Sequence, residues 1–332
     1  MDRLDKFYTK QEIAKKCLSA LDLDKYDVIL EPSAGSGAFF FLLPEDKREG
    51  IDLEPDIEGE IQKADFLQYF PAWSGKKKYL VVGNPPFGKN SSLAKRFFHH
   101  ASIFAQTIAF VLPRTFRKMS TENQLSKNFH KVFEELLPLE SFELPDGTSY
   151  SVPCVFQVWE KKDYNRKTIS LPSTHEDFYF LEKGRHYVVS DHVNVAITID
   201  DEEHGFDFNL EDWKRLKKQK SLFPFLFSNF KAKRIEKDIE WKTQPDFVFR
   251  RAGAQAGKTT LDYESCALEG NLFIKTNDKK VLDVFNKMWD DWWSPRNYEE
   301  RLDTKWDTAG TPSISKAELV QHYKLMKEKM NE

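Results

Sequence analysis

The sequence has few cysteines and no long apolar run, and both absences narrow what the protein can be. Its three cysteines, Cys17, Cys154 and Cys266, are far apart and odd in number, so neither a disulfide framework nor a zinc cluster is indicated. No run approaches the roughly 18 apolar residues of a membrane-spanning helix, and the first residues lack the apolar core of a secretory signal. We therefore expect a cytoplasmic protein with no membrane contact and no metal.

The chain also lacks a strong net charge. Its 332 residues carry a formal charge of −3, and 31% of them are charged against 40% hydrophobic. This composition is typical of a globular protein, and the length predicts two domains of about 150 residues each. Because the chain as a whole is not basic, any surface that binds nucleic acid has to be local.

The most informative stretch is Val81-Val82-Gly83-Asn84-Pro85-Pro86-Phe87-Gly88. Residues 79–82 predict a buried strand, which ends at Asn84 because two consecutive prolines fix φ and lack the N–H that a ladder needs. Asn84 is thus presented at the carboxyl end of a strand, where open α/β sheets bind ligands. The Asn84 side chain and the Pro85 carbonyl supply two acceptors, and Phe87 supplies a flat apolar face. Together these residues fit a planar group that carries an NH2.

A glycine-containing turn lies upstream of this stretch. The predicted strand 28–30 leads into Glu31-Pro32-Ser33-Ala34-Gly35-Ser36-Gly37, and residues 38–43 predict the start of a buried helix. Two glycines at i and i+2 let the backbone turn tightly and approach a ligand, and a helix N-terminus offers free N–H groups. The pattern differs from the dinucleotide G-x-G-x-x-G, and the absence of a Lys-Ser/Thr pair argues against a phosphate-binding P-loop.

Two further acids follow predicted strand ends. Asp52, followed by Leu53, lies about 15 positions past the glycines, where a carboxylate can accept both hydroxyls of a ribose. Asp65 is a third acid, and Phe66 beside it is apolar. We therefore interpret residues 31–66 as a binding segment for a nucleoside-containing cofactor.

The order of these motifs resembles the S-adenosylmethionine-dependent amino methyltransferases with an Asn-Pro-Pro-Phe motif, chiefly those that act on N6 of adenine. The resemblance is close over about 80 residues. It implies that Asn84, Pro85, Pro86 and Phe87 are catalytic. It also implies that S-adenosylmethionine is bound by Tyr8, Thr9, Glu31, Pro32, Ser33, Ala34, Gly35, Gly37, Asp52, Leu53, Asp65, Phe66 and Asn84.

The resemblance assigns roles within this cofactor site. The segment with Tyr8 and Thr9 closes over the methionine end, and Asp52 accepts the ribose hydroxyls. Asp65 accepts from the amino group of the cofactor's adenine, and Phe66 packs near the ring.

Alternating helices and strands are predicted through the first half of the chain. A helix should begin after Thr9, as its N-cap, and run to about Leu21. The further elements expected are a helix over 93–101, a strand over 107–112, a helix over 122–137, and a terminal antiparallel hairpin of 141–144 and 152–160 around the turn 145–148. With the resemblance, this predicts an α/β fold: a Rossmann-like methyltransferase sheet of seven strands, the last antiparallel, with a second, mixed α+β C-terminal domain.

The residue pattern of the sequence changes near residue 163, after which the predicted strands are short and polar. We expect a catalytic domain over 1–163 and a target recognition domain over 164–332. Residues 213–258 hold thirteen basic residues against four acids, a local charge of +9 that favours contact with a nucleic-acid backbone. The predicted nucleic-acid contacts are Lys89, Lys214, Lys217, Lys218, Arg250, Arg251, Gln255 and Lys258. Arg250 and Arg251 are adjacent on a predicted strand and should point to opposite faces.

The extra domain after the catalytic one resembles the arrangement of site-specific DNA amino methyltransferases from restriction-modification or phage-type systems. Double-stranded DNA is then the expected partner, and the target adenine must be flipped out and stacked on Phe87. Three alternatives remain: an RNA adenine-N6 methyltransferase, a protein glutamine-N5 methyltransferase, and a non-catalytic nucleic-acid-binding protein that kept the fold. The last would be indicated by a broken Asn-Pro-Pro-Phe or glycine motif, and neither motif is broken.

Overall fold

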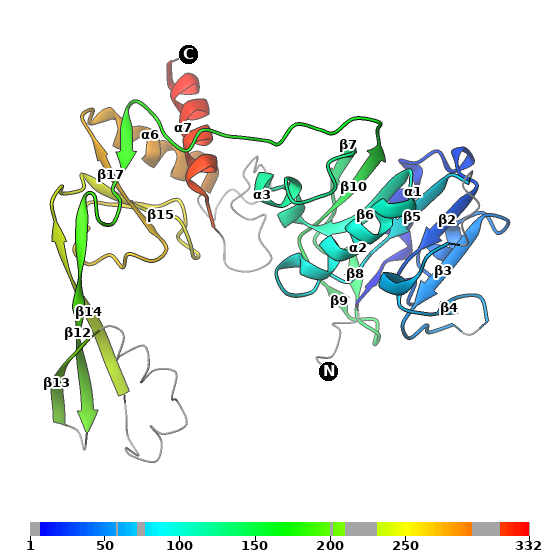
Figure 1. The fold of residues 1–332 in the computed structure, drawn as a ribbon, viewed down its shortest axis with the longest axis horizontal. Helices are drawn as coiled ribbons and strands as arrows, with labels where there is room; N and C mark the ends of the chain where they lie inside the picture. The colour runs from blue at the N-terminus through cyan, green and yellow to red at the C-terminus, as the bar shows by residue number, and fades with distance from the viewer. Residues whose placement is uncertain are drawn as a thin grey trace. The chain divides into compact units, whose positions relative to one another are not determined.

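A computed structural model describes residues 7–57, 59–71, 77–199, 202–209, 231–293 and 313–331 (Figure 1). The chain divides into two units. The first comprises Met1–Pro172, Ala252–Ala256 and Trp292–Glu318, and the second comprises Ser173–Arg251, Gly257–Asp291 and Leu319–Glu332. Among the helices in the described ranges, none has the length and apolar character to cross a membrane.

The first unit is built on a seven-stranded sheet. In spatial order its strands are β4 (Gln62–Lys63), β3 (Arg48–Asp52), β2 (Val28–Glu31), β5 (Tyr79–Gly83), β6 (Thr107–Pro113), β10 (Cys154–Lys161) and β7 (Phe129–Leu136). The strands from β4 to β6 pair in parallel, and β10 is antiparallel to both of its neighbours. The predicted Rossmann-like sheet of seven strands, with its last strand along the chain reversed, is confirmed.

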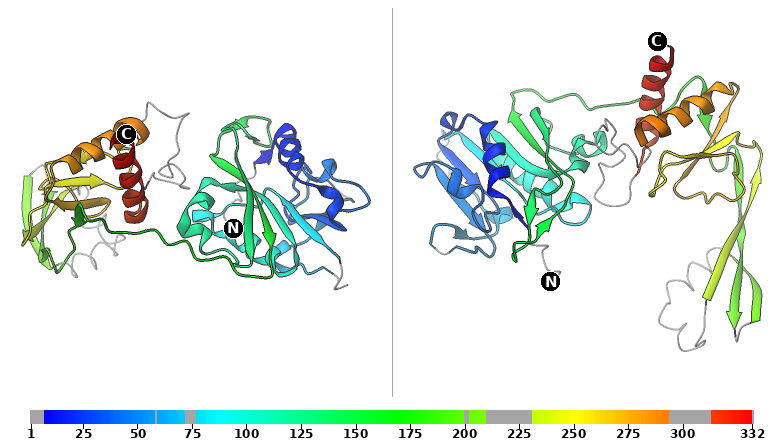
Figure 2. Two further views of the ribbon diagram at one scale, coloured as in Figure 1. Left: turned by 90° about the horizontal axis from the view of Figure 1, so that it is seen from above. Right: turned by 180° about the vertical axis from the view of Figure 1, so that it is seen from behind.

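The central strands are covered on both faces. Every residue of β5 and β6 is buried, because crossover helices pack on both sides of a parallel sheet. Val81 packs on the face covered by α2 (Ser92–Phe104), whereas Leu80 and Val82 pack on the face covered by α1 (Gln11–Ser19). Figure 1 shows α2 on the near face, and the rear view in Figure 2 shows α1. The period of two in a strand therefore divides the core into two clusters.

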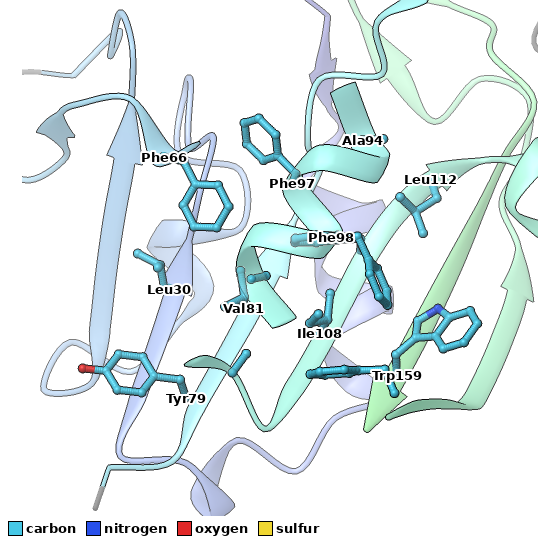
Figure 3. Close-up of a cluster of buried hydrophobic side chains, with 14 of the residues drawn as sticks. Leu30, Phe66, Tyr79, Val81, Ala94, Phe97, Phe98, Ile108, Leu112 and Trp159 are labelled. Atoms are coloured by element: carbon cyan, nitrogen blue, oxygen red, sulfur yellow. The ribbon is translucent and has the colours of Figure 1, made fainter. Parts of the chain in front are cut away.

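Aromatic side chains dominate the cluster under α2 (Figure 3). The fully buried ring of Phe98 meets those of Phe129 and Trp159 edge to face, at centroid distances of 5.8 and 5.5 Å. Ile108 and Val81 of the sheet line the same cluster. This packing fixes α2 against the sheet immediately after the Asn-Pro-Pro-Phe motif.

Two sequence predictions in this unit are wrong in their pairing or type. Residues 122–137 are not a helix, because α3 (Met119–Glu122) ends where the helix was expected to begin and β7 pairs with β10 along most of its length. The 141–160 segment is not one hairpin, since β8 (Phe142–Glu143) pairs with β9 (Ser149–Tyr150) and with β1 (Tyr8–Thr9). Tertiary pairing overrides the local pattern in both cases.

Two helix starts also differ from prediction. Residues 38–43 form only a short 3-10 helix, η2 (Phe40–Leu42), because Pro44 disfavours a helical Leu43, whose ψ is 151°. Thr9 does not cap α1: it belongs to β1, and Lys10 occupies the N-cap position without a side-chain hydrogen bond. The remaining short helical turns are η1 (Leu23–Lys25), η3 (Phe66–Gln68), η4 (Lys89–Ser91) and η5 (Arg114–Arg117).

The second unit mixes sheets and helices, as predicted. One sheet has the order β11 (Phe178–Phe180), β17 (Asn271–Thr276), β15 (Phe247–Arg250) and β16 (Thr259–Thr260), and the other has the order β13 (Glu202–Asn209), β12 (Tyr187–Ile199) and β14 (Lys231–Trp241). The helical elements are α6 (Lys280–Met288), the π-helical turn η6 (Trp289–Trp293) and α7 (Lys316–Asn331). The rings of Phe178, Phe285 and Tyr323 form the centre of its core.

We predict that Phe98→Ala lowers the free energy of unfolding by about 3 to 5 kcal/mol, because it leaves a cavity between α2 and the sheet. Ile103→Ala is the matched control, since Ile103 lies on the same helix but is 53% exposed. The control should change stability by less than about 0.5 kcal/mol. Urea unfolding of both variants tests this, and equal losses would contradict the packing described above.

Candidate active site

A cleft of about 900 Å³ lies in the first unit, where β2, β3, β5 and β6 end. The residues at those ends, Glu31, Asp52, Asn84 and Pro113, all line it. The cleft also brings together the predicted cofactor and catalytic residues Tyr8, Thr9, Pro32, Ser33, Ala34, Gly35, Leu53, Asp65, Phe66, Pro85, Pro86 and Phe87. Of the predicted cofactor residues, Gly37 alone is not part of its lining. Strand ends far apart in the sequence therefore form one concave surface.

The glycine turn is shaped by two residues with positive φ. Gly35 has φ +47°, and a Cβ there would lie 3.2 Å from the ring of Tyr8. Gly37 has φ +79°, and a Cβ there would lie only 2.3 Å from the ring of Phe41. Both positions thus require glycine. Gly37 shapes the turn, whereas Gly35 is part of the cleft wall.

Asp52 connects this turn to the strand beside it. Its carboxylate accepts hydrogen bonds from the backbone N–H of Gly35 and of Glu54, each at 2.8 Å. Each carboxylate oxygen has a second lone pair, so both oxygens can still accept from a ligand hydroxyl. Leu53 next to it is 51% exposed and offers an apolar surface in the cleft. The pair fits a ligand with two hydroxyls and a planar ring.

Asp65 is held in a similar way, next to the buried Phe66. Asp65 accepts from the backbone N–H of Leu67 at 2.9 Å and from the Gln68 amide at 3.3 Å. The ring centroid of Phe66 lies 5.0 Å from that of Phe97, and the residue is almost wholly buried. Phe66 nevertheless lines the cleft beside Asp65, as predicted cofactor residues should.

Glu31 is buried at the base of the cleft. Its Oε2 atom has no hydrogen-bond partner among the described residues. Burial raises the pKa of this carboxyl well above its usual range, and the charge of Asp52 adds to the rise, although the backbone N–H of Phe40 opposes it. A Cβ at Gly83 would lie 3.1 Å from Glu31 Cγ, so glycine at the end of β5 makes room for this side chain.

Asn84 presents an unsatisfied acceptor. Its Oδ1 atom is buried and has no hydrogen-bond partner within the described ranges, while its backbone carbonyl accepts from the Ser33 hydroxyl at 3.0 Å. Buried polar atoms are normally hydrogen-bonded, and an unsatisfied one costs about 1 to 3 kcal/mol. The position of this atom in the cleft indicates a donor on the ligand.

An aromatic wall adjoins Asn84. The ring centroid of Phe7 lies 5.3 Å from that of Phe87, 5.1 Å from that of Phe142 and 5.4 Å from that of Tyr150. Phe7 and Tyr150 line the cleft, although neither is among the predicted site residues. They join the site through the small β1-β8-β9 sheet, and no local pattern reveals that pairing.

Tyr8 and Asp56 link two sides of the cleft. The Tyr8 hydroxyl donates to Asp56 Oδ2 at 2.6 Å, and burial together with Asp56 raises the pKa of Tyr8 to about 12. Asp56 was not predicted, because it belongs to none of the motifs found in the sequence. The other lining residues that sequence reasoning missed include Ser36, Ala38, Phe39, Glu54, Leu67, Gly88, Leu93, Arg96, Phe97, Pro113, Val152 and Pro153.

The predicted nucleic-acid contacts are distributed over both units. Lys89 lines the cleft, Arg251, Gln255 and Lys258 are exposed, and Arg250 is half-buried. Lys214, Lys217 and Lys218 lie outside the described residues.

The two neighbouring arginines differ. Burial raises the pKa of the Cys266 thiol and the charge of Arg250 opposes that rise, which places Arg250 near a buried cysteine. Arg251 follows the end of β15 and is exposed.

Three solved structures are similar to part of this chain. One is a proposed RNA methyltransferase from Pyrococcus horikoshii, at 16% identity and a TM-score of 0.38, covering 48% of this chain and 88% of that one. Another is the modification subunit of a proposed type I restriction enzyme from Vibrio vulnificus YJ016, at 15% identity and a TM-score of 0.37, covering 48% and 45%. A protein of Thermoplasma acidophilum aligns at 17% identity and a TM-score of 0.35, covering 47% and 89%.

Comparison with models of protein families finds no match, and comparison with curated protein sequences finds none either. The chain spans less than half the length of the Vibrio vulnificus subunit. Function therefore has to be argued from the residues of the cleft.

We predict that Glu31→Gln removes a pH dependence of stability. Because the pKa of Glu31 is raised in the folded state, the folded protein keeps this proton at pH values at which the unfolded chain has lost it. Stability therefore falls as the pH rises above about 4.3, the usual pKa of glutamic acid. A glutamine cannot ionise, so the fall should be smaller in the variant. Urea unfolding between pH 5 and pH 8 measures it. The exposed Glu45→Gln is the control, and an equal pH slope in Glu31→Gln and wild type would contradict the prediction.

Proposed function

We propose that this protein is an S-adenosylmethionine-dependent methyltransferase that modifies N6 of adenine in DNA. Residues 164–332 serve as its target recognition domain. The observation that carries the proposal is the buried Asn84 Oδ1, an acceptor with no partner in the described structure, beside Phe87 and in one cleft with Asp52 and Asp65. A planar amine donor would satisfy that atom. A cytoplasmic setting is part of the same proposal.

The cofactor end of the cleft fits S-adenosylmethionine in charge and shape. The predicted cofactor residues and their neighbours contribute the ionisable acids Asp52, Glu54, Asp56 and Asp65, besides Glu31, whose pKa is raised. The cofactor carries a sulfonium and an ammonium group against one carboxylate, so its net positive charge is favoured by these carboxylates. The oxygens of Asp52 remain available to ribose hydroxyls, and Asp65 remains available to an amino group. A volume of about 900 Å³ also lies within the usual range of ligand sites, about 300 to 1,000 Å³.

In this proposal, the protein prepares the amino group of the target adenine to accept a methyl group. The lone pair of an adenine amino nitrogen is delocalised into its ring, so the nitrogen is a poor nucleophile. Hydrogen bonds from its two N–H groups to Asn84 Oδ1 and the Pro85 carbonyl favour a pyramidal nitrogen with a localised lone pair. The cofactor supplies the electrophilic methyl group. Ser33 holds the Asn84 carbonyl, so the acceptor keeps its direction.

The aromatic wall offers a stacking surface for the target adenine. A target adenine inside a duplex has to leave the stack, and a flipped base needs a flat apolar surface. Phe87 lies three residues after Asn84 in the chain and contacts Phe7, which in turn contacts Tyr150. This wall supports a ring whose amino group reaches Asn84.

The choice of DNA rests on the second half of the chain. Residues 213–258 carry a local charge of +9, and most of the chain after Pro172 belongs to a second unit. Incubation with tritiated cofactor and pools of unmethylated DNA, RNA and protein tests the proposal, with label expected in DNA as N6-methyladenine. Label only in RNA or only in protein would overturn the substrate assignment, and label in no pool would overturn the activity.

We predict that Asn84→Ala reduces turnover by at least about a hundredfold and leaves cofactor affinity broadly unchanged. The hydrogen bond of its side chain matters most as the amine changes geometry. Ser33→Ala is the comparison variant, because it removes the bond to the Asn84 backbone carbonyl but leaves Asn84 Oδ1 in place, so it should cost less turnover. Single-turnover rates and calorimetry separate the two effects. Loss of cofactor binding in folded Asn84→Ala protein would make Asn84 a cofactor ligand instead.

We also predict that Arg251→Gln and Arg250→Gln have different effects. Arg251 is exposed, so its loss should weaken binding to an unmethylated target duplex by about 1 to 3 kcal/mol and relax sequence preference. Arg250 lies near the buried Cys266, so its loss should lower the melting temperature instead. Anisotropy with target and random duplexes, together with thermal unfolding, distinguishes them. Equal effects of both substitutions on both duplexes would refute base reading by Arg251.

A further inference from the structure

The charges that line the cleft are separated by sign along the chain. The acids come from the ends of β2 and β3 and from the segments that follow β3 and β4, whereas the cations Lys89 and Arg96 both follow Phe87. The proposed cofactor carries a net positive charge, so these two cations are not expected to attract it. An anion on the substrate is the complementary group.

Arg96 is aimed at the cleft by the geometry of α2. It lies three residues after Leu93 and one before Phe97, and all three line the cleft. Positions i, i+3 and i+4 share one helix face, so this face of α2 forms a wall of the site. Arg96 is exposed and makes no hydrogen bond or ion pair with the described residues.

Lys89 is held on a rigid loop between Phe87 and α2. Gly88 has φ +65°, and Asn90 and Ser91 have φ 54° and 58°, values that non-glycine residues adopt only at a cost. The Ser91 hydroxyl lies 2.8 Å from that of Thr115, a hydrogen bond that anchors the loop. Lys89 is exposed two residues after Phe87 and, like Arg96, has no partner in the part of the chain that the structure describes.

We propose that Lys89 and Arg96 bind the backbone phosphate beside the nucleotide whose base is methylated. This inference rests on the proposed function and adds to it which residues of the cleft hold the nucleic-acid backbone. A base stacked on Phe87 brings its own sugar and phosphate to the mouth of the cleft, where two unpaired cations can neutralise the phosphate. A glutamine in a protein has no anion attached at that distance. DNA and RNA share the phosphate, and separate substrate arms distinguish them.

The test compares Arg96→Gln and Lys89→Gln with Lys95→Gln in the full-length protein. Lys95 is the matched control, because it neighbours Arg96 on α2 but does not line the cleft, and its Nζ donates to Gln124 at 3.0 Å. Methyl transfer is measured on unmethylated genomic DNA, on transcribed RNA and on a protein pool, each at two salt concentrations. Loss of a charge-assisted hydrogen bond should raise KM about tenfold in either cleft variant. The control should stay within about twofold, and calorimetry should give wild-type affinity for S-adenosylmethionine in all three.

Further outcomes decide the proposal. Arg96→Lys keeps the charge and should recover most of the lost affinity. If the two cleft variants have the same KM as Lys95→Gln on a substrate pool that the wild type methylates, the phosphate assignment is overturned. The proposed activity then stands. Transfer by the wild type to protein alone would overturn both. Should Arg96→Gln unfold, the Lys89→Gln variant decides, since Lys89 lies in an exposed loop.

Discussion

The parallel pairing of β2 with β5 is the constraint on which the cleft depends. Its register places Leu30 opposite Val81, so Glu31 reaches the level of Gly83 just before Asn84. β3 and β4 extend the sheet on one side of this pair, and β6, β10 and β7 extend it on the other. The pair is therefore the topological switch point of the sheet, where crossovers leave in opposite directions and open a crevice.

The cleft is built at some cost to the stability of the free protein. Glu31 Oε2, Asn84 Oδ1 and Thr9 Oγ1 are buried without partners among the described residues, and all three residues line the cleft. Unsatisfied buried polar atoms are destabilising unless a ligand satisfies them. Such a concentration in one place is expected of a binding site rather than of a structural core.

The cleft carries charges of both signs. Its five acids lie at or after the ends of β2, β3 and β4 in the chain, and its two cations follow Phe87. A cationic cofactor would be attracted to the acids, and an anionic substrate to the cations. The local electric field of the cleft, rather than the near-neutral charge of the whole chain, would then act on the two ligands.

Most of the fold and the two linear motifs could be read from the sequence, because buried parallel strands are continuous apolar runs and their ends carry glycine, proline or acids. By itself the sequence determined that Glu31, Asp52, Asp65 and Asn84 follow strands. Only tertiary structure decided that β7 is a strand, since its residues obtain their backbone partners from β10. Tertiary structure likewise placed Phe7, Asp56, Arg96 and Tyr150 in the cleft. These side chains come from a hydrogen-bonded small sheet, a loop and a helix face, and their positions depend on contacts between distant segments that no local pattern records.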